Sequence, residues 1–228
     1  MMRLRSITCF GYGFRQTNSD VIQFIRFNLL VFAIIFFFSY VSALAAIRFT
    51  YSRTLQETIV LFLSLPIVTY AAAGTMYYYI SYSKGITVRL NQLYRGYRYF
   101  LHYLLYAFIL DCIYIVFWKN VPELFGAFQD SMLPLAAGSV FFMYAVLRLF
   151  FLPIVLVDTR LPFEESLIES LRLSRTNMTG ILLFVAVSVL LLCAGLLIAG
   201  AGILYSSAVI LLSYIKYYLD CRDELYAD

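Results

Sequence analysis

The stretch VLRLFFLPIVLVD, residues 146–158, places Arg148 and Pro153 inside an otherwise apolar run that ends at Asp158. Such a run is typical of a helix in the hydrocarbon core of a bilayer. A charged side chain at that depth costs roughly 3 kcal/mol unless it is paired or reaches water. A proline inside a helix removes a backbone hydrogen bond and kinks the chain. The stretch therefore predicts a kinked membrane helix whose polar groups need partners.

The composition agrees with a lipid environment. Of the 228 residues, 63% are hydrophobic and 13% are charged, whereas about 25% are charged in an ordinary soluble domain. A core of this size cannot hide so much apolar surface from water. The net charge of +4 comes without a long basic run or an aromatic-basic RNA motif. It therefore indicates membrane orientation and no nucleic-acid partner.

We predict an all-α integral membrane protein with a single transmembrane domain over residues 1–228 and six transmembrane helices arranged as three hairpins. A span needs roughly 20 apolar residues. The predicted spans cover about 21–47, 58–83, 97–118, 131–157, 179–199 and 203–219. Residues 1–20 lack the apolar run and cleavage site of a signal peptide, and we interpret them as a cytoplasmic tail. The last two spans are joined by AGAG, residues 199–202, which predicts a tight hairpin.

The distribution of lysine and arginine predicts that the N- and C-termini are cytoplasmic, because positive residues are enriched in cytoplasmic loops. Thirteen of these residues fall on one side of the predicted spans: Arg3, Arg5, Arg15, Arg26, Lys84, Arg89, Arg95, Arg98, Arg160, Arg172, Arg175, Lys216 and Arg222. The opposite side has three, which are Arg48, Arg53 and Lys119.

Two cytoplasmic connections are predicted to form short amphipathic interfacial helices, at about 85–96 and 162–176. In the second, one face has Phe163, Leu167, Leu171 and Ser174, while another has Glu165, Glu169 and Arg172. Helices of this kind lie in the membrane interface and could bind a protein partner.

The candidate structural or ligand-binding residues are Arg148, Asp111, Asp158 and Pro153. Arg148 lies about nine residues from the cytoplasmic end of its span, or roughly 13 Å deep. It could pair with Asp111 on the neighbouring span, or extend toward the cytoplasm and meet Asp158 or the interfacial helix. It could also line a substrate pathway, and Pro153 could break its helix, as happens at transporter sites.

No catalytic, cofactor or metal site is predicted. The four cysteines show no paired spacing, and the single histidine, His102, cannot build a multi-histidine metal site. The sequence contains no P-loop, no H-E-x-x-H and no G-x-S-x-G motif. Asp111 has no second intramembrane acid, as an aspartyl enzyme would need. We therefore expect that the protein is not an enzyme.

The order of features from residue 70 to 220 resembles a known group. The features are Arg148, Pro153 and Asp158, then the helix EESLIESLRLSRTN, and earlier GTMYYYISYSKGITVRLNQLYRGYRYFLHYLL. This order resembles the YciC-like bacterial inner-membrane proteins, and it is similar to the membrane domain beside some glycerophosphodiester phosphodiesterases. The resemblance implies a six-helix protein of the bacterial cytoplasmic membrane, and it transfers no catalytic residue.

Two functions follow as expectations. One is a non-enzymatic scaffold or accessory subunit of a cell-envelope complex, which contacts membrane lipids and a protein partner or a second copy of itself. The other is a transporter or lipid-handling protein that binds an anionic head group near Arg148.

Overall fold

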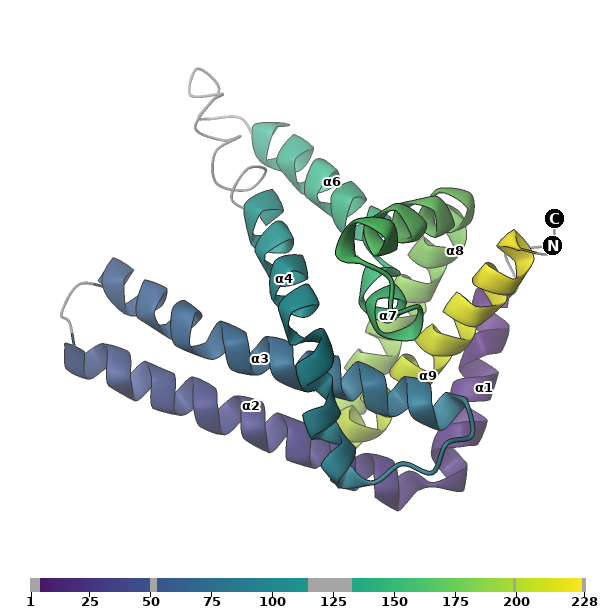
Figure 1. The fold of residues 1–228 in the computed structure, drawn as a ribbon, viewed down its shortest axis with the longest axis horizontal. Helices are drawn as coiled ribbons and strands as arrows, with labels where there is room; N and C mark the ends of the chain where they lie inside the picture. The colour runs from purple at the N-terminus through teal and green to yellow at the C-terminus, as the bar shows by residue number, and fades with distance from the viewer. Residues whose placement is uncertain (1–4, 50–52, 115–132, 199, 227–228) are drawn as a thin grey trace.

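The computed structural model describes residues 5–49, 53–114, 133–198 and 200–226, and the chain is helical in all the regular structure of these residues (Figure 1). The elements in chain order are α1 (Arg5–Ser19), α2 (Val21–Phe49), α3 (Arg53–Ser83), the 3₁₀-helix η2 (Leu90–Tyr99), α4 (Phe100–Tyr114), α6 (Leu133–Arg148), α7 (Leu152–Asp158), α8 (Phe163–Leu197) and α9 (Gly200–Leu225). Some of the predicted features lie outside the described residues. They are the span ends at 115–118 and 131–132, the charges of Arg3 and Lys119, and the start of the AGAG turn at Ala199.

Four helical segments are long and apolar enough to cross a membrane: Val21–Arg48, Gly138–Asp158, Phe163–Leu197 and Gly202–Leu225. Many large apolar side chains on them face outward, for example Phe36, which is 74% exposed. Lipid is the solvent that such a surface requires. These observations fit a multi-pass membrane protein, and the count of six spans stays a prediction.

Two pairs of helices extend in different directions from the rest of the molecule (Figure 1). Helices α2 and α3 run side by side toward one edge of the molecule, and α4 and α6 project toward another. Aromatic side chains join the start of α2 to the end of α3. Phe27 stacks on Tyr78 with ring centroids 3.7 Å apart, and Phe24 stacks on Tyr79 at 5.4 Å. The remaining helices, α1, α7, α8 and α9, pack against one another.

The predicted N-terminal tail is the helix α1, which packs along α9 (Figure 1). Its buried residues Cys9, Phe10, Gly13 and Thr17 recur at helical spacing. A Cβ on Gly13 would lie 2.5 Å from the Val209 carbonyl oxygen, so the backbones of the two helices approach closely. Burial and the nearby carboxylate of Asp220 raise the pKa of the Cys9 thiol to about 12, which keeps this thiol protonated and unreactive near neutral pH.

The predicted span 131–157 is not one continuous helix. Helix α6 ends at Arg148 and α7 begins at Leu152, so the chain breaks just before Pro153, which lies in the first turn of α7. Proline is favoured in a first helical turn because its missing N–H would be unpaired there anyway. The break is therefore sharper than the kink expected from the sequence.

The predicted interfacial helix 162–176 forms the first part of α8. This helix runs on through Asn177, where φ is −116° and ψ is 17°, values that kink it. The kink lies where the sequence separates the interfacial helix from the span 179–199. Further along, a Cβ on Gly195 would lie 2.8 Å from the Gly202 carbonyl oxygen, so α8 and α9 form the tightly packed hairpin that the sequence predicts.

The first predicted interfacial segment, 85–96, contains part of η2, which packs against α3 through glycine. A Cβ on Gly96 would lie 2.4 Å from the backbone nitrogen of Gly74. The atoms that this Cβ would meet belong to the backbone of α3, so no side chain can rotate to make room for it. The two glycines thus fix the position of η2 on α3.

We predict that Gly96→Ala lowers the free energy of unfolding by about 1–3 kcal/mol, because η2 must move away from α3. The measurement is thermal unfolding in a mild non-ionic detergent, followed by circular dichroism. The matched control is Gly11→Ala on α1, where a Cβ has no neighbour within 4 Å and the higher helix propensity of alanine should leave stability unchanged or raised. Equal melting temperatures for the Gly96 variant and the wild type would contradict the tight contact.

Candidate functional site

The break between α6 and α7 leaves backbone carbonyls without helical partners, and other helices supply those partners. Ser174 Oγ on α8 donates a hydrogen bond to the Arg148 carbonyl at 2.8 Å. The Tyr214 hydroxyl on α9 donates to the Phe150 carbonyl. Lipid offers no donor, so each bare carbonyl would cost several kcal/mol, or roughly 2–7 by transfer measurements. The two hydroxyls therefore hold α8 and α9 against the break.

A third hydroxyl comes from α4. Tyr103 donates to the carbonyl of Pro153 at 2.6 Å, and its side chain is buried. Phe151, at the centre of the break, has no exposed surface. Its ring lies 5.7 Å from that of Tyr217 and 6.3 Å from that of Tyr214. The break is thus enclosed by aromatic rings of α9 and by hydroxyls from three helices.

Asp158, at the end of α7, forms the second polar centre. Its carboxylate is 2% exposed and accepts from Lys84 Nζ at 2.5 Å and from Arg222 Nη1 at 2.5 Å. The Tyr218 hydroxyl adds a hydrogen bond at 3.2 Å, and the Arg222 guanidinium lies over the Tyr218 ring at 5.6 Å. A buried carboxylate is stable only when cations and donors surround it. We call Asp158, Lys84, Arg222 and Tyr218 the Asp158 cluster.

The Asp158 cluster joins the ends of three predicted spans. Lys84 follows α3, Asp158 ends α7, and Arg222 lies in the last turn of α9. The distribution of lysine and arginine predicts that all three ends lie on one side of the membrane, and in the structure they are in contact. The cluster therefore ties the three predicted hairpins together at one end.

The structure places the predicted site residues apart from one another. Arg148 is the last residue of α6 and its side chain is half-buried, as is that of Asp111 on α4. Among the described residues, no ion pair within 4.0 Å joins Arg148 to Asp111 or to Asp158. Of the two pairings considered for Arg148, neither is formed, and its backbone carbonyl is the group that makes the interhelical contact.

Several of the residues that do make the polar contacts were not predicted from the sequence. Lys84 and Arg222 counted only as orientation charges, Ser174 was placed on the apolar face of the interfacial helix without a partner, and Tyr214 was not singled out. A weak signal exists on α9, where Tyr214, Tyr218 and Arg222 recur every four residues and so share one helix face. That spacing could have indicated a polar stripe facing another helix.

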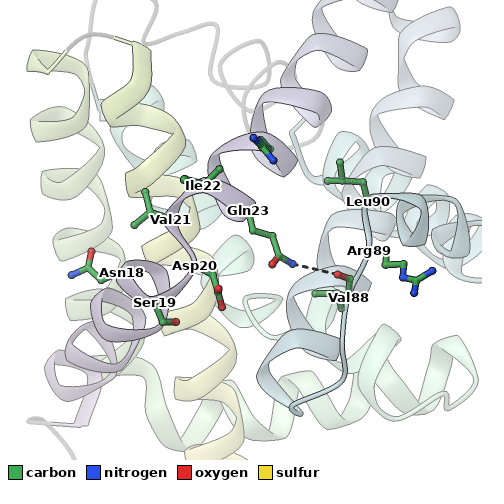
Figure 2. A pocket seen from close by; sticks show the side chains of 10 residues that line it. Asn18, Ser19, Asp20, Val21, Ile22, Gln23, Val88, Arg89 and Leu90 are labelled. Atoms are coloured by element: carbon green, nitrogen blue, oxygen red, sulfur yellow. Dashed lines mark hydrogen bonds between the residues drawn. The ribbon is translucent and has the colours of Figure 1, made fainter.

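Two connected grooves lie away from the α6–α7 break, between the α1–α2 junction and residues 85–90. The larger has a volume of about 730 Å³ and the smaller about 420 Å³, and both are lined by Asp20, Gln23 and Val88. Figure 2 shows the larger one, where the Gln23 amide reaches across to the Val88 carbonyl at 3.3 Å. Neither groove is lined by Arg148, Asp111 or Pro153.

No group of three or more His, Cys, Asp or Glu side chains is arranged for a metal ion within the described ranges. The chemistry at the α6–α7 break and at the Asp158 cluster is that of interhelical hydrogen bonds and ion pairs. Comparisons with protein-family models, with curated proteins and with solved structures find no match.

We predict that Tyr214→Phe lowers the free energy of unfolding by about 1–3 kcal/mol, because the Phe150 carbonyl loses its donor in a site without water. The ring and its packing are retained, so the change reports on the hydroxyl alone. Thermal unfolding in detergent measures it. Tyr40→Phe is the control, because the Tyr40 side chain is 57% exposed on α2 and its hydroxyl should not matter. A Tyr214 variant as stable as the control would contradict the role of this bond.

We predict that Asp158→Asn destabilises the protein by about 1–3 kcal/mol, because Lys84 and Arg222 lose their shared anion. Both cations are partly exposed and reach water, so the loss is smaller than for fully buried charges. The measurement is the apparent melting temperature together with the yield of monodisperse protein. Glu165→Gln on the exposed face of α8 removes the same charge without a cluster contact and should be neutral. Equal losses in both variants would mean that net charge, and not the cluster, decides stability.

Proposed function

We propose that this chain is a non-enzymatic multi-pass membrane protein that serves as a scaffold or accessory subunit of a cell-envelope complex. The observation that carries the proposal is the use of its membrane-embedded polar groups. The hydroxyls of Ser174, Tyr103 and Tyr214 bond to backbone carbonyls of 148–153, and Asp158 holds Lys84 and Arg222. Groups used in this way stabilise a helical framework, and no reacting centre is needed to explain them.

A surface suited to a protein partner supports the proposal. The first part of α8 exposes Ile168, which is 65% accessible, beside the exposed charges of Glu165 and Arg172. On its other face the same segment buries Ser166 and Ser170. The segment is thus fixed to the framework on one side and presents a mixed apolar and charged face on the other, a composition common at protein interfaces.

The finer location is part of the proposal. The excess of lysine and arginine on one side of the predicted spans places both termini in the cytoplasm. The resemblance to YciC-like proteins suggests the bacterial cytoplasmic membrane. The alternative is a transporter or lipid-handling protein with an anionic head group at Arg148. It stays a prediction, and Arg148 lines neither of the two grooves described above.

Extraction from the original host in a gentle detergent, followed by native mass spectrometry, tests the scaffold proposal. We expect a second protein to be retained at fixed stoichiometry. Ile168→Glu should lower the ratio of partner to chain severalfold without changing the melting temperature, because the residue is exposed. Glu164→Gln, a change at a neighbouring exposed position, is the control and should retain the partner. A chain recovered alone, or only with copies of itself, would contradict the proposal.

A further inference from the structure

The larger groove has the size and the position of a binding site for a lipid head group. Its volume of about 730 Å³ lies within the range of small-molecule sites. One wall is the α1–α2 junction and the first turns of α2, and the other is the segment that leads into η2 (Figure 2). Its lining includes Asp20, Gln23, Arg26 and Arg89.

The groove has an excess of positive charge. Arg26 and Arg89 are exposed, and within the described part of the chain neither makes an ion pair or a hydrogen bond. The one carboxylate of the lining, Asp20, accepts a hydrogen bond of 2.5 Å from the Tyr82 hydroxyl. The lining therefore has two arginines without an ion pair in the described chain and one carboxylate that already has a donor. In Figure 2 the Arg89 side chain points away from Gln23, so it must rotate to meet a ligand in the groove.

The depth of the groove also points to lipid. Arg26 is the last charged residue before the stretch 27–47 of α2, which contains no charge, and α2 is one of the long apolar helices. If α2 spans the bilayer, Arg26 lies where the hydrocarbon ends and the phosphate groups begin. Basic pockets between helices at this level bind anionic head groups, through the charge and the planar donors of arginine.

We propose that this groove binds the phosphate group of an anionic lipid, with Arg26 and Arg89 as its charge partners and the lipid chains lying beside α2. The inference is independent of the scaffold proposal and uses a different part of the molecule. Arg148 takes no part in it, because the groove is bounded by other elements.

The test uses the full chain in a non-ionic detergent, titrated with phosphatidylglycerol or with phosphatidylcholine and followed by native mass spectrometry. We expect one phosphatidylglycerol to bind at concentrations about tenfold lower than phosphatidylcholine, because a net negative phosphate group attracts both arginines. The variant R26Q/R89Q should lose this preference. The variant R172Q/R175Q removes the same charge from the exposed side of α8 and should retain it.

Competition with soluble glycerol phosphate distinguishes the two sources of the phosphate group. No displacement at millimolar concentration supports a lipid ligand, while displacement would assign the groove to a soluble phosphate and overturn the lipid part of the proposal. Equal binding of both lipids by the wild type, or an unchanged preference in R26Q/R89Q, would overturn the site itself. Both arginines are exposed, so the variant should fold, and an unchanged melting temperature in the absence of added lipid verifies this.

Discussion

Backbone carbonyls that have lost their helical partners in a water-free environment impose the strongest constraint on this structure. A continuous helix satisfies its own carbonyls, but the break between α6 and α7 exposes those of Arg148 and Phe150. Donors must then come from elsewhere in the chain. Ser174 and Tyr214 provide them, so the break requires α8 and α9 to lie where they do.

The same break positions the charged contact. Because α7 starts anew at Leu152, it carries Asp158 to the ends of α3 and α9, where Lys84 and Arg222 meet it. Tyr214 and Arg222 are eight residues apart on α9, or about 12 Å along its axis. Both face the segment 150–158, so α9 is held at two points against α7. Two contacts on one face fix both the position and the rotation of a helix, which one contact cannot do.

The sequence predicted many of the features that depend on residue order, and few of the contacts between helices. The need for polar partners around 146–158 and the boundary at Asn177 follow from residue order. The partners of Asp158 do not, because spacing within one helix carries no information about which helices are neighbours. A carboxylate partner was one of several alternatives for Arg148, and in the described structure the Asp158 carboxylate contacts Lys84 and Arg222 instead. Residues 1–20 were interpreted as a tail because they lack a long apolar run, and their helix α1 instead buries a short face with Cys9, Phe10, Gly13 and Thr17.

The state of a polar group distinguishes a structural role from a binding role in such a protein. A buried group whose partners come from the same chain, such as Asp158, gains nothing from a ligand and would lose stability if one displaced its partners. An exposed charged group without an ion pair in the described chain, such as Arg26, loses no internal contact when an anion approaches. Anionic ligands are therefore expected at exposed arginines such as Arg26, while the Asp158 cluster holds the ends of the helices together.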